Sequence, residues 1–459
     1  MSSAPLAGRT IGVLGLARSG LAAARLALSR GARVYASDAG DGAKAREAAE
    51  QVRSLGGDAE AGGHDLAKLA ACERVVLSPG IPPTAAVLRA PEIAGVPVIP
   101  EVEFAYGLMD AYYIAITGTN GKTTVTAMIG DLLVQAGMDA AVGGNIGTAL
   151  SELALREPQP KVAVVEVSSF QLSGIRDFTP RIGILTNLAP DHLDWYPDVE
   201  AYYADKARLF RNASADSRWI LNAEDGRARE LIGDAPGTRY YFRAQSQPSS
   251  DERGGWLSED GWLTLRIDRD EERLVRADEL KILGPHNVAN ALAASLAARL
   301  AGADSDSIAR GLRKFEAPPH RLQPVAEREG VLWINDSKAT NIASTRVAVR
   351  GMTRPTVLLL GGKHKGEPYT ELLPDLGGGR VKAILAYGEA APVIVGDLEG
   401  RAPVERVEGS FEEVVRRARE TAAPGDAVLL SPACSSFDMF ANYEERGKRF
   451  AELAAGGEA

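Results

Sequence analysis

The sequence has few cysteines and no long apolar run. It contains two cysteines, Cys72 and Cys434, far apart and without a CxxC partner. This usage predicts two reduced thiols in a cytosolic protein. No segment approaches the roughly 18 apolar residues of a membrane helix, and the first residues lack the apolar stretch of an export signal. We therefore expect a cytoplasmic protein without a membrane partner.

The chain also lacks an excess of positive charge. Its 52 Lys and Arg residues face 61 Asp and Glu residues, which gives a formal net charge of -9. This balance argues against a nucleic-acid partner, because nucleic-acid binding requires a basic surface. Hydrophobic residues make up 45% of the chain and charged residues 25%, as in soluble globular proteins. A length of 459 residues predicts two to four domains.

Three segments share one local pattern: an apolar β-branched run, a glycine-containing turn and a helical pattern. They are "TIGVLGLARSGLAAARLAL", "YIAITGTNGKTTVTAMIGDLL" and "TVLLLGGKHKGEPYTELL". The pattern predicts an α/β fold with mostly parallel, doubly wound sheets. A Pro-rich stretch near residue 100 and the Pro-Pro pair after residue 317 predict boundaries, which give parts 1–100, 101–317 and 318–459. Within the polar stretch 243–280, "GWLTLRI" predicts a small antiparallel addition.

The segment "GTNGKTT", residues 118–124, has the context of a phosphate loop. It follows the strand pattern "YIAIT" and precedes a helical pattern. The common loop motif would place its first glycine at Ile116, so the glycine spacing departs from that motif. Lys122 would neutralise phosphates and Thr123 would place its hydroxyl on Mg²⁺. The alternative is a tight strand-to-helix turn with a solvated lysine.

Polar residues follow two further strand patterns. Glu166 ends "KVAVVE", at the sheet edge where α/β proteins bind ligands and where a carboxylate suits Mg²⁺; the alternative is a surface acid. Asp191, His192 and Asp194 follow "RIGIL", where His192 is a metal ligand or hydrogen-bond donor, unless Asp191 only caps a helix. Lys206 stands in a helical pattern that by itself indicates a solvated lysine.

The last third of the sequence carries three polar clusters after apolar runs, "NDSKATN", "GGKHKGE" and "SPACSSFD". Together they favour a binding site over three ordinary loops. Before them, Asn287 and Asn290 enter a helix and either read a base or ribose edge or, for Asn287, cap the helix.

The N-terminal segment "GVLGLARSG" is a weak nucleotide signal. Its glycines at 12, 15 and 20 do not fit GxGxxG, and Asp38 ends the next strand pattern. A dinucleotide and another phosphate-bearing ligand both stay open.

In this order along the chain, "TGTNGKTT", "VEVSSFQL", "TNLAPDHLDW", "GPHNVAN", "PHR", "NDSKATN" and "LLSPACSSFD" resemble the Mur ligase family, ATP-dependent amide ligases of peptidoglycan precursor synthesis. The resemblance implies three domains: a Rossmann-like N-terminal UDP-binding domain, a P-loop ATPase-type central domain and a Rossmann-like C-terminal domain that closes over the site. "NDSKATN" and "SPACSSFD" resemble the branch that adds D-glutamate to UDP-N-acetylmuramoyl-L-alanine, and the D configuration depends on this resemblance alone.

The family reaction begins when the alanyl carboxylate attacks the γ-phosphate of ATP to give an acyl phosphate. The glutamate amine then attacks the carbonyl carbon, and phosphate leaves. The resemblance implies ATP, two Mg²⁺ ions and a CO₂-derived carbamate on Lys206, and we expect a monomer. The alternatives are a Mur-type ligase for another amino acid, a P-loop phosphotransferase and a Rossmann-type nucleotide-binding protein.

The resemblance also assigns site residues. It implies catalytic roles for Lys122, Asn145, His192, Lys206 and Lys338, and metal ligands at Thr123, Glu166, His192 and Lys206. It implies ATP contacts at Gly118, Thr119, Asn120, Gly121, Lys122, Thr123, Thr124, Asn287, Asn290, Arg321 and Asp336. It implies UDP contacts at Arg18, Ser19, Ser78, Pro79 and Gly80, and a D-glutamate pocket of Lys338, Thr340, Lys365, Ser436, Phe437 and Tyr443. Trp195 stands where many relatives have arginine.

Overall fold

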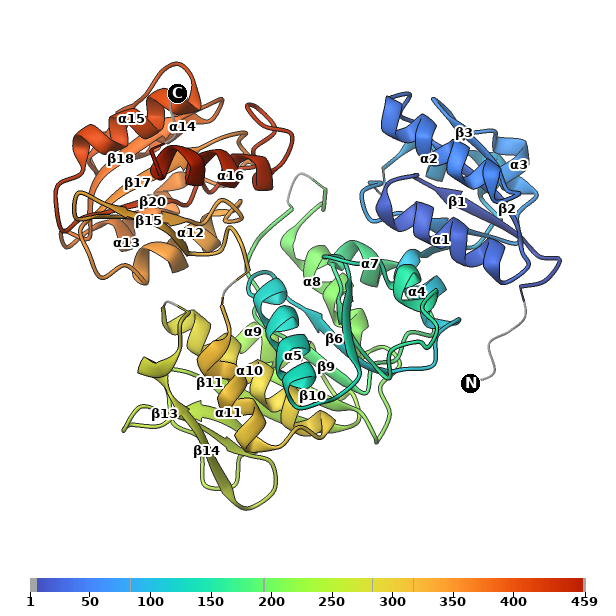
Figure 1. The fold of residues 1–459 in the computed structure, drawn as a ribbon, viewed down its shortest axis with the longest axis horizontal. Helices are drawn as coiled ribbons and strands as arrows, with labels where there is room; N and C mark the ends of the chain where they lie inside the picture. The colour runs from blue at the N-terminus through green and yellow to red at the C-terminus, as the bar shows by residue number, and fades with distance from the viewer. Residues whose placement is uncertain (1–5, 83, 193–194, 283, 317, 457–459) are drawn as a thin grey trace. The chain divides into compact units, whose positions relative to one another are not determined.

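The computed structural model describes residues 6–82, 84–192, 195–282, 284–316 and 318–456. Its described strands form three mostly parallel sheets, with helices between most of the successive parallel strands (Figure 1). The predicted α/β class is therefore confirmed. Asp194 lies outside the described residues.

The first sheet has five parallel strands in the order β3-β2-β1-β4-β5. Its strands are β1 (Thr10–Leu14), β2 (Arg33–Asp38), β3 (Asp58–Ala61), β4 (Arg74–Leu77) and β5 (Val98–Pro100). Its helices are α1 (Arg18–Ser29), α2 (Ala43–Ser54) and α3 (Leu66–Ala70), and 3-10 turns cover Ala86–Arg89 and Pro91–Ile93.

The second sheet has nine strands in the order β14-β13-β12-β11-β10-β9-β6-β8-β7. The strands from β6 to β12 are parallel: β6 (Tyr112–Thr117), β7 (Ala140–Gly144), β8 (Val162–Glu166), β9 (Ile182–Leu185), β10 (Arg218–Asn222), β11 (Thr238–Arg243) and β12 (Gly254–Leu257). The last two, β13 (Trp262–Arg266) and β14 (Glu271–Arg276), pair antiparallel. The antiparallel addition predicted from "GWLTLRI" is confirmed, because this segment forms β13.

Eight helices are described between residues 101 and 314: α4 (Glu101–Tyr106), α5 (Lys122–Gln135), α6 (Leu150–Ala154), α7 (Ser169–Ser173), α8 (Val199–Ala207), α9 (Gly226–Leu231), α10 (Pro285–Ala301) and α11 (Ser305–Lys314). Two 3-10 turns cover Arg208–Phe210 and Ala277–Glu279. The helix predicted around Lys206 is α8.

The third sheet has the order β15-β16-β20-β17-β18-β19. Its strands are β15 (Gln323–Arg328), β16 (Val331–Asn335), β17 (Thr356–Gly361), β18 (Val381–Tyr387), β19 (Val404–Arg406) and β20 (Ala427–Leu430), and only β15 runs antiparallel. Its helices are α12 (Ile342–Arg350), α13 (Leu373–Leu376), α14 (Ala391–Leu398), α15 (Phe411–Thr421) and α16 (Tyr443–Ala454), with a 3-10 turn at Tyr369–Leu372.

The chain divides into two compact units. The first comprises Met1–Leu188, Asp198–Ala277 and Asn290–Leu312; the second comprises Ala189–Pro197, Asp278–Ala289 and Arg313–Ala459. The division into three domains at residues 100 and 317 stays a prediction.

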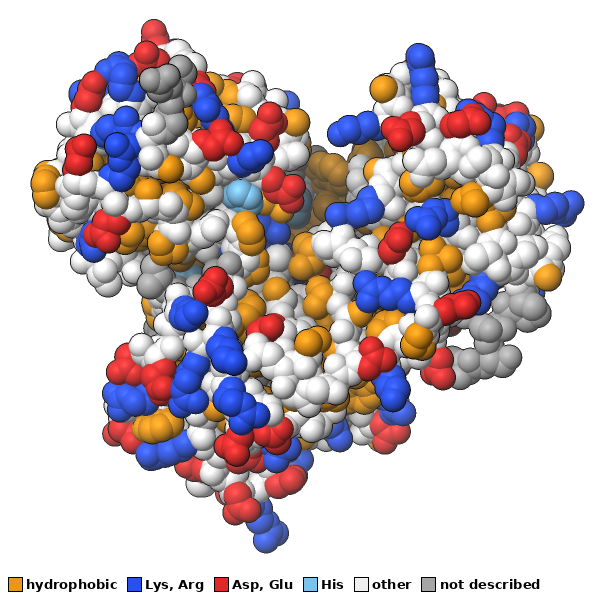
Figure 2. Space-filling view, in the orientation of Figure 1, with side chains coloured by type: hydrophobic (Ala, Val, Ile, Leu, Met, Phe, Trp, Pro, Cys, Tyr) orange, Lys and Arg blue, Asp and Glu red, His pale blue; other side chains and the backbone are white. Residues whose placement is uncertain are grey.

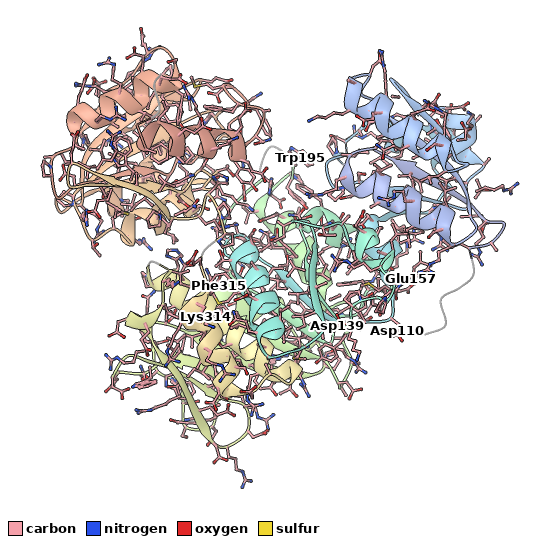
Figure 3. All side chains as sticks on the ribbon, in the orientation of Figure 1. Asp110, Asp139, Glu157, Trp195, Lys314 and Phe315 are labelled. Atoms are coloured by element: carbon pink, nitrogen blue, oxygen red, sulfur yellow. The ribbon has the colours of Figure 1, made fainter. Side chains whose placement is uncertain are left out.

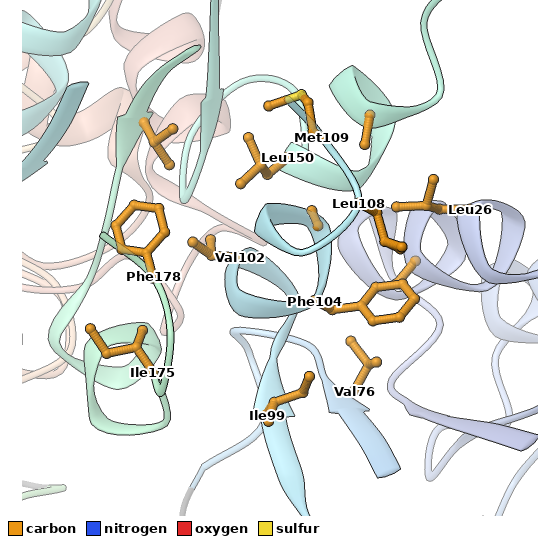
Figure 4. Close-up of a cluster of buried hydrophobic side chains, with 14 of the residues drawn as sticks. Leu26, Val76, Ile99, Val102, Phe104, Leu108, Met109, Leu150, Ile175 and Phe178 are labelled. Atoms are coloured by element: carbon orange, nitrogen blue, oxygen red, sulfur yellow. The ribbon is translucent and has the colours of Figure 1, made fainter. Parts of the chain in front are cut away.

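One hydrophobic core joins the first two sheets within the first unit. Figure 4 shows side chains of α1, α4, α6 and the loop before β9 packed together, among them Leu26, Phe104, Leu150 and Phe178. Burial of this apolar area stabilises the unit by the hydrophobic effect. The first sheet is therefore packed onto the helices of the second.

The visible surface mixes both signs of charge, with Lys and Arg side chains interspersed among Asp and Glu (Figure 2). None of the described helices is long and apolar enough to cross a membrane. Neither cysteine forms a disulfide, and both are buried, in agreement with the predicted thiols.

Candidate active site

Residues 118–121 connect β6 to α5 as a tight loop. Ile116 is fully buried in β6 and pairs in register with Glu166 of β8. Position 116, where the common loop motif has its first glycine, is therefore an inward-facing residue of β6. Helix α5 begins at Lys122, and its N-terminal end supplies positive potential at the loop.

Glycine is required at position 118 because the phosphate loop passes very close to Thr186 and Asn187, the residues that follow β9. Its φ is 135°, and a Cβ atom there would lie 2.0 Å from Thr186 Oγ1. Only glycine combines this backbone conformation with so short a distance. The close approach brings the loop against residues 186–187, which follow β9.

Asn187 and Thr186 fix the loop, and neither was singled out from the sequence. The Asn187 side chain accepts from Asn120 N at 2.9 Å and donates to Asn120 O at 3.0 Å. Thr186 Oγ1 donates to the same carbonyl oxygen at 2.6 Å. Their position directly after a strand at the carboxyl edge was the available signal.

Two lysine side chains converge on the Gly118 carbonyl. Lys122 Nζ donates to Gly118 O at 2.9 Å and to Thr119 O at 2.8 Å. Lys206 Nζ, from α8, donates to Gly118 O at 2.8 Å and lies 4.4 Å from the Tyr202 ring centroid. Lys206 is only 1% exposed. The solvated lysine that the helical pattern alone indicated is therefore wrong, because α8 turns this residue inward.

Glu166 lies at the carboxyl end of β8, beside the loop that follows β7. Its Oε1 accepts from Asn145 Nδ2 at 2.9 Å. Its side chain is buried, and Oε2 has no hydrogen-bond partner. A buried carboxylate oxygen without a partner is costly in the free protein and suits a bound cation.

Acidic residues stand at the opposite edge of this sheet. Asp110, Asp139 and Glu157 precede β6, β7 and β8, at the amino ends of these parallel strands (Figure 3). The predicted phosphate loop and Glu166 stand at the carboxyl ends. The strand direction thus separates surface acids from the candidate site.

A cavity of about 430 Å³ opens on the first sheet between α1 and α2. Its lining includes Arg18, Asp38 and Lys44. Both Asp38 oxygens accept backbone amides, from Leu16 N at 2.7 Å and Gly40 N at 2.8 Å.

The other predicted UDP residues follow β1 and β4. Ser19 is in the first turn of α1. Ser78 Oγ donates to Gly15 O at 3.0 Å, and Pro79 and Gly80 continue the turn after Ser78. The structure places these residues at the carboxyl edge of the first sheet, where α/β folds bind ligands.

In the second unit, Asp336 follows β16 and is buried. Its carboxylate accepts from Ser431 Oγ at 2.8 Å and from Leu322 N at 3.2 Å. Burial raises the pKa of Asp336 to about 7, while these hydrogen bonds and the charge of Arg321 oppose the rise.

The predicted glutamate residues stand after β16, β17 and β20 or at the start of α16. Lys365 Nζ lies 3.4 Å from Thr340 Oγ1, and Lys338 Nζ lies 5.1 Å from the Tyr443 ring centroid. Ser436 is buried and Phe437 is 69% exposed. The structure thus brings these side chains to the carboxyl edge of one sheet.

A small charged cluster surrounds Lys365. Lys365 Nζ lies 3.9 Å from Asp191 Oδ1, and Asn341 Nδ2 donates to Asp191 Oδ2 at 2.9 Å. Burial, with the Asp191 charge, raises the pKa of Glu367 to about 7, and Lys365 opposes the rise. Asn341 and Glu367 were not singled out from the sequence as individual residues, although Asn341 ends the "NDSKATN" motif and Glu367 ends the "GGKHKGE" motif.

His192 and Asn287 belong to the second unit, whereas Lys206, Glu166 and Asn290 belong to the first. His192 has φ 57°, and its Nε2 lies 3.7 Å from Asp191 Oδ2. Trp195 is 36% exposed (Figure 3). Among the described ranges, no three His, Cys, Asp or Glu side chains converge as a metal site.

Three family models match the chain. The MurD-like N-terminal domain of Mur ligases matches residues 9–100, the Mur ligase middle domain residues 116–298, and the Mur ligase glutamate ligase domain residues 320–434.

Relatives match over nearly the full length. A UDP-N-acetylmuramoylalanine--D-glutamate ligase of Anaeromyxobacter dehalogenans is 44% identical over 99% of both chains. A ligase of the same name from Salinibacter ruber is 40% identical over 96% of both.

Solved structures share the fold. UDP-N-acetylmuramate-alanine ligase from Thermotoga maritima has a TM-score of 0.59 at 19% identity and covers 98% of this chain and 100% of that one. A pseudomurein peptide ligase type C from Methanothermus fervidus has a TM-score of 0.59 at 21% identity, covering 92% and 96%. With the family models and the relatives, these findings establish that the chain belongs to the Mur ligase family, in the branch of the UDP-N-acetylmuramoylalanine--D-glutamate ligases.

Proposed function

We propose that this protein joins D-glutamate to UDP-N-acetylmuramoyl-L-alanine in an ATP-dependent reaction that releases ADP and phosphate. The observation that carries the proposal is the 44% identity, over 99% of both chains, to a relative named for this reaction. The phosphate loop, with Lys206 and Glu166 beside it, supports a phosphoryl transfer within that reaction.

The loop residues would hold ATP through backbone and side-chain donors: Gly118, Thr119, Asn120, Gly121, Lys122, Thr123 and Thr124. Lys122 and the N-terminal end of α5 would neutralise phosphate charge. This neutralisation is needed because the nucleophile, the alanyl carboxylate, is itself an anion. Asn287, Asn290, Arg321 and Asp336 would contact the adenosine.

We propose that Thr123 and Glu166 would hold one Mg²⁺ ion, and that His192 and a carbamylated Lys206 would be ligands of a second. The unpartnered Glu166 Oε2 supports the first assignment. When bound, Mg²⁺ supplies Lewis-acid stabilisation of charge on the phosphoryl oxygens. Asn145, hydrogen-bonded to Glu166, would orient that carboxylate and contact the muramoyl-alanine part.

Lys206 would act as a carbamate. Its Nζ shares the Gly118 carbonyl with Lys122 Nζ, so two ammonium groups would repel each other there. Carbamylation requires the unprotonated amine of Lys206. The neutral amine attacks CO₂, forms an N–C bond and releases a proton, which converts a cation into an anionic oxygen ligand.

The amide-forming step would use the pocket of Lys338, Thr340, Lys365, Ser436, Phe437 and Tyr443. Lys338 and Lys365 would balance the two carboxylates of glutamate. The amine attacks the acyl-phosphate carbonyl, the C–N bond forms, phosphate leaves with the C–O bond electrons, and the ammonium proton passes to solvent. Arg18, Ser19, Ser78, Pro79 and Gly80 would hold UDP near the cavity of the first sheet. The cytoplasmic location and the monomeric state stay predictions.

A phosphate-release assay with product mass analysis tests the function. Release that requires ATP, UDP-N-acetylmuramoyl-L-alanine and D-glutamate together, with an amide product of matching mass, is expected. Equal turnover of L-glutamate, L-alanine or a diamino acid would reject the assigned specificity. Phosphate transfer without a new amide would support a phosphotransferase instead.

A further inference from the structure

Arg446 is a fully buried arginine that lies beneath the predicted glutamate pocket. It belongs to the first turns of α16, which packs on the third sheet. Arg446 has no role in the proposed reaction, and none of the motifs found in the sequence includes it. A buried guanidinium is unusual, because arginine is almost never fully buried unless it is paired.

The guanidinium joins the loops after two adjacent strands. Nε donates to Ser337 Oγ at 2.9 Å and Nη2 to Ser337 O at 2.8 Å, in the loop after β16. Nη2 also donates to Cys434 O at 3.2 Å and Nη1 to Ser435 O at 3.4 Å, in the loop after β20. All these acceptors are neutral oxygens, so these hydrogen bonds fix the positions of the two loops and do not form an ion pair.

A third loop, after β17, closes on the same group. A Cβ atom on Gly362 would lie 3.1 Å from Arg446 Nη1 and 2.2 Å from Ser435 O. The backbone of the next residue is tied to the same carbonyl, since Lys363 N donates to Ser435 O at 2.8 Å. Glycine at 362 therefore allows β17 to approach the guanidinium.

The three loops carry the predicted glutamate contacts. Lys338 and Thr340 follow β16, Lys365 follows β17, and Ser436 and Phe437 follow β20. Tyr443 is linked as well, because the Ser337 hydroxyl accepts from Arg446 and donates to Tyr443 O at 2.8 Å. The guanidinium thus binds the loops after β16 and β20 directly, and the loop after β17 lies against it at Gly362.

We propose that Arg446 is a positioning residue for the amino-acid substrate: its planar fork of donors holds the loops after β16 and β20 at the spacing that binding needs. The identity of the substrate as D-glutamate rests on the proposed function. Lysine cannot replace the fork, because its ammonium is a point charge that cannot reach both loops with fixed geometry.

The test uses Arg446→Met, which keeps the side-chain volume, and Arg449→Met as the matched control. Arg449 is on the same helix, is partly buried and pairs with Glu412 at 2.7 Å, outside the loops that Arg446 contacts. We expect Arg446→Met to raise the KM for D-glutamate by about tenfold to a hundredfold, as displacement of positioned groups does. The KM for UDP-N-acetylmuramoyl-L-alanine, assigned to the first sheet, should change less than about twofold.

Hydrogen–deuterium exchange of residues 336–341 and 432–437 gives a readout that needs no substrate. Exchange there should be faster in Arg446→Met and unchanged in Arg449→Met. If wild-type protein does not use D-glutamate, the proposed function fails, and the exchange measurement still tests the positioning. Unchanged exchange, or KM values that rise equally for all substrates, would overturn the proposal.

Ser337→Ala is the alternative variant for this test if Arg446→Met does not fold. It removes the hydroxyl between Arg446 and Tyr443 and leaves the guanidinium buried. We expect a rise in the KM for D-glutamate of about threefold to tenfold, the size of the net effect of one ordinary intramolecular hydrogen bond. No change in this KM would contradict the proposal.

Discussion

Lys206 and Lys122 donate to the same carbonyl oxygen, that of Gly118. At the residue scale, the proposed carbamate agrees with this convergence, because an anionic Lys206 would attract the Lys122 ammonium. Lys206 is only 1% exposed, whereas a lysine that only binds solvent would lie on the surface.

Lys206→Ala should therefore lose about a hundredfold or more of the ligase rate, since a positioned charge is removed from the phosphoryl-transfer site. A short carboxylate such as formate should partly restore it by supplying the missing oxygens. Steady-state phosphate release measures both effects, with Lys314→Ala, an exposed residue of α11, as the control. A wild-type rate in Lys206→Ala would remove the carbamate from the mechanism.

Asp336 gives a pH prediction. Burial raises its pKa to about 7, from the 3.8 of an ordinary aspartate. A raised folded-state pKa means that the folded protein binds the proton more tightly than the unfolded chain. Stability should therefore fall as pH rises between these values, by about 1 kcal/mol per pH unit.

Thermal melts of the nucleotide-free protein from about pH 5 to about pH 7 measure this effect. Asp336→Asn, which cannot ionise, should have the shallower decline with pH, while Glu367 titrates in both proteins. Identical pH dependence in the two proteins would contradict the raised pKa.

At the element scale, the loop between β6 and α5 depends on its packing against residues 186–187. Gly118→Ala should abolish ATP binding, because its Cβ would meet Thr186 Oγ1 at 2.0 Å in a backbone conformation of φ 135°. Gly137→Ala, at the end of α5, is a matched control: φ is 76°, but nothing lies within 4 Å of its Cβ.

We expect Gly137→Ala to cost about 1–2 kcal/mol of unfolding free energy from backbone strain alone and to bind ATP normally. Calorimetric titration with ATP and thermal melts separate the two effects. Normal ATP affinity in Gly118→Ala would show that the loop can move away from β9 at little cost.

The elements were largely predictable because apolar β-branched runs mark buried parallel strands whatever their neighbours. The strand YIAIT, the helix around Lys206 and the antiparallel addition all follow from such local patterns. Residues that act through distant partners were not predictable. Asn187 contacts a loop 67 positions away, and Arg446 contacts Ser337 across 109 positions. Neither contact produces a periodic pattern of residues that sequence analysis could detect.

At the scale of the whole molecule, the carboxyl edges of three sheets carry the three groups of predicted contacts: UDP on the first, phosphates on the second and glutamate on the third. This division suits a reaction with three substrates. An acyl phosphate hydrolyses in water. A protein that binds all three substrates before the phosphoryl transfer therefore limits the loss of this intermediate.

Phosphate release should accordingly be negligible when any one substrate is omitted. Initial rates with each substrate left out in turn measure this dependence. ATP hydrolysis at the full rate without the UDP substrate would indicate an ATPase and would contradict the ligase proposal.

In the proposed reaction, the γ-phosphate of ATP passes to the alanyl carboxylate before the amide forms. UDP-N-acetylmuramoyl-L-alanine labelled with ¹⁸O in that carboxylate tests it directly, because the acyl oxygen leaves with the phosphate. Mass analysis of the released phosphate should find one ¹⁸O atom per amide formed. Unlabelled phosphate accompanying the amide would contradict the acyl-phosphate mechanism.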